Sequence, residues 1–122
     1  MNLHTRIEIL VSLGNYLTQE TDAYQDTQFR AWAENKWFIP DYINLSGKAI
    51  AAKMLQKQTL SDIANQYQIP DQQSYPKTIG LVMAGNIPYV GLQDLICIFL
   101  SGHKVKIKAS SKDTVLLKQL LL

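Results

Sequence analysis

The chain has 122 residues, of which 47% are hydrophobic, so it is long enough for one domain with an ordinary buried core. Its formal net charge of +2 is too small to predict nucleic acid or an anionic membrane as a partner. The single cysteine excludes an intrachain disulfide, and no apolar run approaches the roughly 20 residues of a membrane span. We therefore expect a soluble cytoplasmic protein with no membrane-spanning segment.

Residues 1–75 are expected to form a helical lead-in. The first helix is predicted over residues 3–17, because apolar residues recur there at helical spacing. The polar residues 18–26 are predicted to form a loop. Residues 27–40 then read as a short aromatic helix that ends at Pro40.

Two more helices are predicted before the chain changes character. A longer helix over residues 41–57 has a candidate buried stripe consisting of Ile43, Gly47, Ile50 and Met54. Thr59 is then a candidate N-cap for a short helix over residues 60–67. The connector at residues 70–76 has a proline at either end and closes the lead-in.

Residues 76–122 are predicted to alternate strand, helix, strand and helix. Ile79 to Ala84 is a continuous apolar run, which is typical of a strand covered on both faces. Residues 90–100 read as a buried helix, residues 104–108 as a second, alternating strand, and residues 110–122 as a helix opened by hydroxyl side chains. This order predicts an α/β fold with a right-handed crossover and a parallel sheet. The last pattern stops without a helix-ending residue, which we interpret as a chain cut short.

The segment AGNIP, residues 84–88, is expected at the carboxyl edge of this sheet, where α/β proteins bind ligands. Gly85 allows a close turn, and Pro88 is suited to starting the next helix. Asn86 would then present an amide that can donate two hydrogen bonds. The alternative is structural, since asparagine also serves to turn the chain or to cap a helix.

Lys108 ends the second predicted strand, beside a helix expected to begin near Ser110 or Ser111. A lysine next to a helix N-terminus is suited to binding phosphate. Ser110 and Asp113 fit a capping box equally well, so both interpretations stand. No metal site is expected.

The stretch IGLVMAGNIPYVGLQDLICIFLSGHKVKIKASSKD, residues 79–113, resembles the opening of the coenzyme-binding domain of the aldehyde dehydrogenase superfamily. More narrowly, it resembles the LuxC-type acyl-CoA reductases, which make fatty aldehydes from acyl thioesters. The preceding NKWFIPDYINLSGKAI, residues 35–50, resembles the helical lead-in of that family. The resemblance implies the start of a Rossmann-like coenzyme-binding sheet, which this chain carries only in part.

The resemblance also implies residue roles. Asn86, in NIP, corresponds to the asparagine that donates to the oxyanion formed when a cysteine thiolate attacks the carbonyl. Lys108, in IKASS, corresponds to the lysine that binds the adenosine ribose or its 2′-phosphate, with Ser110 and Ser111 as further coenzyme contacts. Ser111 stands where many members carry a glutamate. Because a serine can donate to a 2′-phosphate, NADPH is favoured, and NADH stays as an alternative.

The implied reaction reduces a fatty acyl-CoA, or another acyl thioester, to an aldehyde through a cysteine thioester. The nucleophilic cysteine and the glutamate base of the family lie beyond Leu122, so the 122-residue chain is expected to be inactive. Cys97 is no substitute, because it is expected to pack in the core, where burial makes a thiol inert. Assembly into a homo-oligomer is left open.

Two other classes of function compete with the enzyme. A non-catalytic interaction module would use exposed apolar surface and would associate with itself or with other proteins. A helix-turn-helix DNA-binding protein is suggested by TLSDIANQYQIPDQQ, residues 59–73. The segment after it contains Pro76, Gly80 and a single base, Lys77, so a cationic recognition helix is not expected there.

Overall fold

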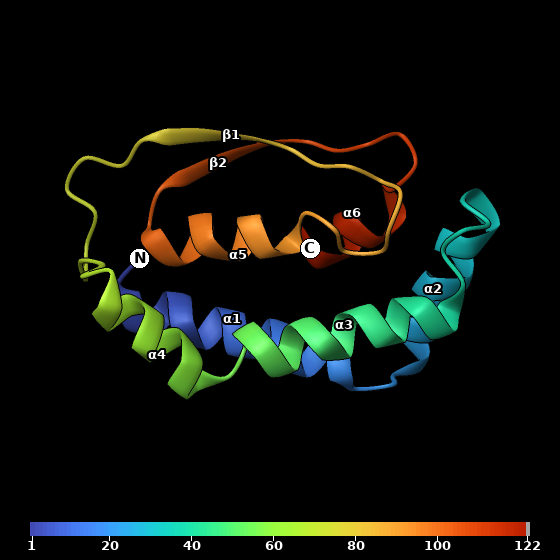
Figure 1. Ribbon diagram of the computed structural model, residues 1–122, viewed down its shortest axis with the longest axis horizontal. Coiled ribbons are helices and arrows are strands. Elements are labelled where there is room, and N and C mark those ends of the chain that lie inside the picture. The colour runs from blue at the N-terminus through green and yellow to red at the C-terminus, as the bar shows by residue number, and fades with distance from the viewer. Residues whose placement is uncertain (122) are drawn as a thin grey trace.

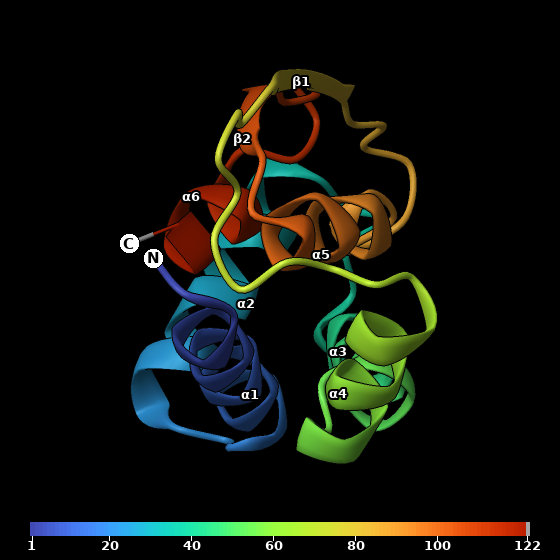
Figure 2. The ribbon, with the colours of Figure 1, turned by 90° about the vertical axis from the view of Figure 1, so that its left-hand side faces the viewer.

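The helices and strands form three layers (Figures 1 and 2). A computed structural model describes residues 1–121. The elements in chain order are α1 (Leu3–Thr18), α2 (Asp22–Glu34), α3 (Pro40–Met54), α4 (Lys57–Gln66), β1 (Thr78–Val82), α5 (Leu92–Ser101), β2 (Lys104–Lys108) and α6 (Val115–Leu121). The two strands form the outer layer, α5 and α6 the middle one, and α1 to α4 lie on the far side of the middle layer. The chain is therefore mixed α/β and mostly helical.

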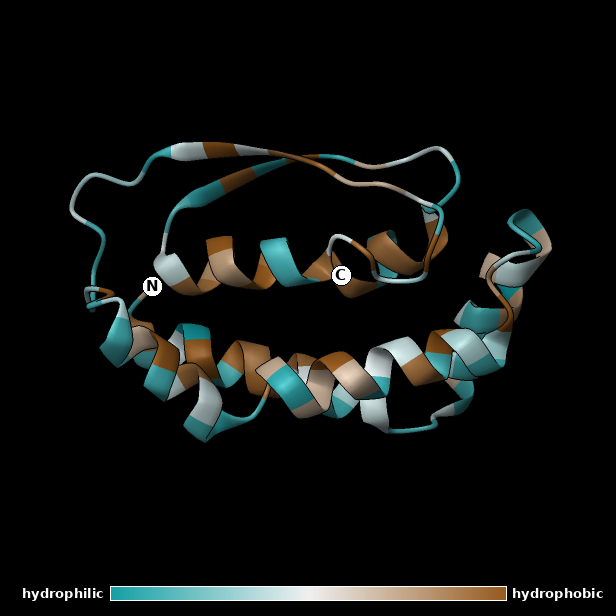
Figure 3. Cartoon of the chain, in the orientation of Figure 1, coloured by the Kyte–Doolittle hydropathy of each residue, from teal (hydrophilic) through white to brown (hydrophobic). Residues whose placement is uncertain are grey.

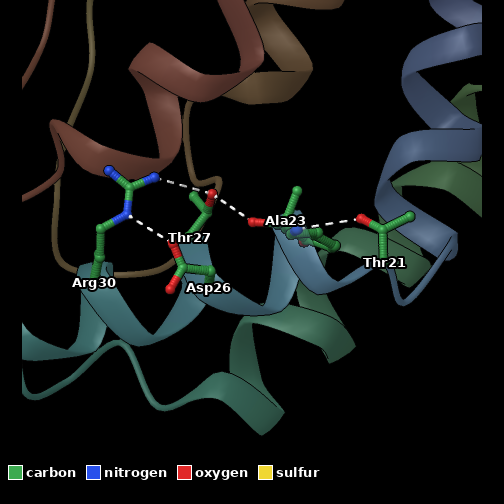
Figure 4. Close-up of polar contacts among 6 residues, drawn as sticks. Thr21, Ala23, Asp26, Thr27 and Arg30 are labelled. Atoms are coloured by element: carbon green, nitrogen blue, oxygen red, sulfur yellow. Dashed lines mark hydrogen bonds and ion pairs between the residues drawn. The ribbon is translucent and has the colours of Figure 1, made fainter.

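The starts of α2 and α3 differ from the sequence expectations. The side chain of Thr21 accepts a hydrogen bond from Tyr24 N at 3.2 Å, so α2 begins at Asp22, inside the segment expected to be a loop (Figure 4). Pro40 opens α3 and does not end α2, because at the first helical position its missing N–H leaves no hydrogen bond unmade. Helix α2 ends at Glu34.

Helix α4 begins two residues before its expected cap. Its N-cap is Gln56, which makes no side-chain capping bond, so Thr59 lies within the helix. In α3 the buried residues are Ile43, Gly47 and Ala51. Of the expected stripe, Ile43 and Gly47 are buried, and Ile50 and Met54 are partly buried and pack against the core. Ala51 is also buried, because residues four apart lie on one helix face.

The predicted parallel pairing is confirmed. Strand β1 pairs with β2 in parallel, in a register that aligns Thr78 with Lys104 and Val82 with Lys108, and α5 connects the two strands. The expectation that β1 is covered on both faces is wrong for the described residues, because α5 and α6 lie on the same side of the sheet (Figure 2). On the open side, Val82 is 78% exposed.

One hydrophobic core spans the lead-in and the strand-containing part of the chain. In the lead-in it includes Leu17, Ile43 and Leu60, and in the middle layer it includes Leu92 and Ile96; all five are 1% exposed or less. Apolar segments recur along α5, which lies between the sheet and the lead-in (Figure 3). Burial of this apolar surface from both sides is the main force that holds the layers together.

Arg6 is the buried charge in this interface, with only 3% of its surface exposed. Its Nε donates to Leu100 O at 3.0 Å, near the end of α5. Its Nη1 donates to Met1 O at 2.7 Å and to Asp71 O at 3.2 Å, and its Nη2 donates to Pro70 O at 3.0 Å. Burial lowers the pKa of Arg6, and the nearby Asp71 carboxylate partly offsets that effect. The guanidinium thus joins α1, the connector and α5.

Gly102 makes room for this guanidinium. It ends α5 in the left-handed region at φ 84°, a conformation that glycine adopts without strain. A Cβ at this position would lie 3.1 Å from Arg6 Cζ and 2.8 Å from Gln73 Cγ. Glycine is therefore required here both by the backbone angle and by the close approach of Arg6.

We expect Arg6→Met to lower the free energy of unfolding by about 3 kcal/mol or more, since hydrogen bonds from a charged group each contribute about 1.5–3 kcal/mol. Urea denaturation measures this. The matched control is Arg30→Met, whose exposed guanidinium lies 3.6 Å from Asp26 and donates to Thr27 Oγ1 at 3.3 Å (Figure 4). That surface pair contributes less than about 1 kcal/mol. Equal losses in the two variants would show that Arg6 does not hold the layers together.

Candidate functional site

The candidate site lies at the carboxyl edge of the sheet, where two loops leave neighbouring strands. Val82, the last residue of β1, is aligned with Lys108, the last residue of β2. The pairing continues one step further, because Met83 N donates to Lys108 O at 3.0 Å. The loop that carries Asn86 and the loop that carries Ser110 therefore start side by side.

Gly85 allows the two loops to touch. A Cβ on Gly85 would lie 2.5 Å from Ser110 Oγ and 2.7 Å from Ser110 Cβ. These distances are too short for non-bonded atoms, so no side chain fits at this position. Ser110 is itself fixed in a turn, since its Oγ accepts from Lys112 N at 3.2 Å and its carbonyl accepts from Asp113 N at 3.1 Å. The backbone of Gly85 therefore packs against the side chain of Ser110, and a larger residue at position 85 would push the two loops apart.

Asn35, which follows α2, bonds to both loops from the helical lead-in. Its Nδ2 donates to Gly85 O at 3.3 Å and to Lys112 O at 3.1 Å. Sequence reasoning missed this residue. An asparagine after a helix is a recognised end signal, but these two partners lie 50 and 77 residues further along the chain, where no local pattern could indicate them.

Asn86 is exposed at this edge, and no hydrogen bond occupies its side-chain amide among residues 1–121. Asn86 neither adopts the left-handed backbone of this loop nor caps α5. The left-handed backbone in this loop belongs to Tyr89, with φ 60°, and the N-cap of α5 is Gly91. Pro88 does not start α5, which begins four residues later, at Leu92. The Asn86 amide is therefore free to donate to a ligand.

Tyr89 holds the Asn86 loop against the helical lead-in. Its side chain is 4% exposed, and its hydroxyl lies 2.8 Å from the hydroxyl of Tyr24. Gly47 admits this pair, since a Cβ there would lie 3.2 Å from the Tyr24 hydroxyl and 3.4 Å from the Tyr89 ring. Burial raises the pKa of both tyrosines, so both stay neutral. This contact pins the loop three residues after Asn86.

Lys108 and Ser111 are both exposed, while Ser110 is partly covered. Among the described residues Lys108 has no ion-pair partner. The expectation of a helix beginning near Ser110 or Ser111 is wrong, because α6 begins at Val115. The backbone N–H of Leu116, in the first turn of α6, acts on the Asp113 carboxylate and lowers its pKa.

Cys97 is exposed, so the expectation that it packs in the core is wrong. Helix α5 lies between two layers, yet Cys97 stays open to solvent. Partial desolvation raises the pKa of its thiol, and the nearby Asp94 carboxylate raises it further. A raised pKa leaves less thiolate at neutral pH, which keeps the thiol a weak nucleophile.

Comparisons of the chain with protein-family models, with curated proteins and with solved structures returned no match. The resemblance of residues 79–113 to the acyl-CoA reductases therefore rests on its motifs. Within residues 1–121, no cluster of three or more histidine, cysteine, aspartate or glutamate side chains could hold a metal ion. No helix in the same range is long and apolar enough to cross a membrane.

Asp113 is a buried acid in the loop that joins β2 to α6, with 8% of its surface exposed. Its Oδ1 has no hydrogen-bond partner among the described residues. Desolvation raises the pKa of this carboxyl to about 6, and the hydrogen bond from Leu116 offsets part of the effect. Because the folded-state pKa lies above the reference value of 3.8, this group stabilises the fold most below pH 4, and that contribution is lost as the pH rises through 6.

We expect Asp113→Asn to be more stable than the parent chain at pH 7.5 by about 2 kcal/mol, because an amide avoids the burial of a charge. The difference should shrink towards pH 4, where the parent carboxyl is protonated. Urea unfolding at several pH values between 4 and 7.5 measures it. Asp62→Asn, an exposed change on α4, serves as the control and should follow the parent curve. A pH-independent difference for Asp113→Asn would contradict the account.

Proposed function

We propose that this chain is the N-terminal part of an NAD(P)H-dependent acyl-CoA reductase, as the LuxC-type resemblance of residues 79–113 implies. In this proposal the β1–α5–β2 unit begins a Rossmann-like coenzyme-binding sheet. The observation that carries the proposal is the parallel register, because Val82, at the start of the Asn86 loop, pairs with Lys108. Ligands of open parallel sheets bind at this carboxyl edge.

Asn86 is proposed to be the oxyanion donor. Its exposed amide has no partner within the described residues, so both N–H groups are available. The loop around it is held by Tyr89 on one side and by Asn35 on the other, which gives the donor a fixed position. A fixed donor lowers the energy of the transition state because it needs no reorganisation as charge develops, and removing one costs about 10²–10³ in kcat.

Lys108 is proposed to bind the adenosine ribose or the 2′-phosphate of the coenzyme, which supplies hydride when bound. The exposed, unpaired ammonium of Lys108 fits this role. Ser111 is exposed and can donate to a 2′-phosphate, which favours NADPH over NADH. Ser110 Oγ already accepts from Lys112 N, which leaves its O–H free to donate to a coenzyme phosphate.

The acyl donor in this proposal is a fatty acyl-CoA or another acyl thioester. A cysteine beyond Leu122 would take the acyl group, and the enzyme would be cytoplasmic. Assembly into a homo-oligomer is compatible with the exposed face of the sheet, where Val82 is open to solvent. The second candidate function is a non-catalytic interaction module, which would use exposed apolar surface. On this face Val82 is the apolar contribution, beside the exposed lysines Lys104, Lys106 and Lys108.

The coenzyme role of Lys108 can be tested on this chain by measuring NADPH binding with isothermal titration calorimetry. We expect Lys108→Ala to raise the Kd at least tenfold, since a charge-assisted hydrogen bond contributes about 1.5–3 kcal/mol. Lys104→Ala is the matched control, because Lys104 is exposed at the amino end of the same strand and on the same face. Equal effects of the two changes, or no NADPH binding by the parent chain, would count against the proposed function.

A further inference from the structure

A hollow of about 320 Å³ lies between the segment that joins α2 to α3 and the loop that joins β2 to α6. The residues that line it are Glu34, Asn35, Lys36, Trp37, Ser111 and Lys112. Of the residues assigned above to the coenzyme, Ser111 alone lines the hollow. The hollow therefore adjoins the proposed coenzyme contacts and shares Ser111 with them.

Asn35 fixes the two walls of the hollow. Its Oδ1 accepts from Trp37 N at 3.1 Å, and its Nδ2 donates to Lys112 O at 3.1 Å. The Asn35 side chain therefore bonds to Trp37 in one wall through its acceptor and to Lys112 in the other wall through its donor. A hollow whose walls are already fixed loses little conformational entropy when a ligand enters, and this favours binding.

The chemistry of the walls fits a nucleotide. The Trp37 side chain is 64% exposed, and the ammonium of Lys112 lies 5.6 Å from its ring centroid. An exposed indole offers a surface on which a base can stack, and an adjacent ammonium can pair with a phosphate. Lys36 adds a second positive charge, and the Ser111 hydroxyl adds a hydrogen-bond donor. Glu34, the one acid in the lining, can accept from a ribose hydroxyl or a base amino group.

The size of the hollow limits the ligand. Sites for small molecules typically enclose about 300–1,000 Å³, so this one is at the lower end and suits a single nucleotide unit. We propose that the hollow binds a phosphorylated adenosine, with the base on Trp37 and a phosphate on Lys112, Lys36 and Ser111. The choice of adenosine rests on the proposed function, because NADPH and coenzyme A each end in a phosphorylated adenosine, with the extra phosphate at the 2′ and the 3′ position respectively.

The test is calorimetric titration of the 122-residue chain with adenosine 2′,5′-bisphosphate, adenosine 3′,5′-bisphosphate and 5′-AMP. We expect at least one bisphosphate to bind more tightly than 5′-AMP. Trp37→Leu and Lys112→Ala should each raise its Kd at least about fivefold, the lower bound for loss of a base stack. The matched controls are Tyr75→Leu, an aromatic residue that is 89% exposed, and Lys106→Ala, an exposed lysine of β2; neither should change the Kd.

The titrations answer two questions: whether the hollow binds a phosphorylated adenosine, and whether that group belongs to NADPH or to coenzyme A. Tighter binding of the 2′,5′ compound assigns the hollow to NADPH, and tighter binding of the 3′,5′ compound assigns it to coenzyme A. The proposal is overturned if no bisphosphate binds at about 5 mM, far above the Kd expected of a cellular ligand, if 5′-AMP binds as tightly, or if Lys106→Ala weakens binding as much as Lys112→Ala.

The role proposed for the hollow and the coenzyme role proposed for Lys108 can fail independently, and the titrations distinguish the two failures. If Lys108→Ala leaves NADPH binding unchanged while Trp37→Leu and Lys112→Ala weaken the binding of a bisphosphate, the role of Lys108 fails and the hollow stands. If only Lys108→Ala has an effect, the hollow is not a nucleotide site. Because Trp37 and Lys112 are exposed, the variants should fold, and their unfolding midpoints check this.

Discussion

The buried guanidinium of Arg6 is the constraint on which the arrangement of the layers depends. A buried charge is tolerated only when its donors are used, and Arg6 uses them on carbonyls of the N-terminus, the connector and α5. Those three segments must therefore meet at one point. The last carbonyls of a helix lack partners within the helix and carry partial negative charge, so the end of α5 is a favourable place for this cation. Moving α5 away from α1 would break the hydrogen bond from Arg6 Nε to Leu100 O and leave that buried donor and carbonyl without partners.

Asn35 acts in a corresponding way at the opposite, carboxyl end of the strands. It connects the helical lead-in to both loops of the candidate site through Gly85 and Lys112. The lead-in is therefore part of the candidate site, because it fixes the spacing between the loop of Asn86 and the loop of Ser111. Tyr24 and Tyr89 add a second connection between the same layers. In the proposed enzyme this would let a mostly helical segment position the catalytic donor and the coenzyme contacts without touching the reacting atoms.

The elements that could be predicted from the sequence are those whose pattern is local. Helix α1 and strand β2 follow from periods of 3.6 and 2, and the strand, helix, strand order was enough to predict the parallel pairing. The predictions for Pro40 and Cys97 were wrong because each depended on context. A proline can end one helix or open the next, and an apolar helix can still expose one position. The contacts of Arg6, which join the layers, and those of Asn35, which organise the candidate site, connect residues far apart in the chain and leave no periodic signal.

The central functional claim is that Asn86 stabilises an oxyanion in an acyl-CoA reductase of which this chain is the N-terminal part. The most direct measurement is NADPH-dependent reduction of a long-chain acyl-CoA by the product of the complete reading frame, with the 122-residue chain assayed beside it. The account predicts activity in the longer protein and none in the chain, with Asn86→Ala lowering kcat about 10²–10³-fold and leaving NADPH binding unchanged. Reductase activity in the 122-residue chain, or an unchanged kcat in the Asn86→Ala enzyme, would contradict it.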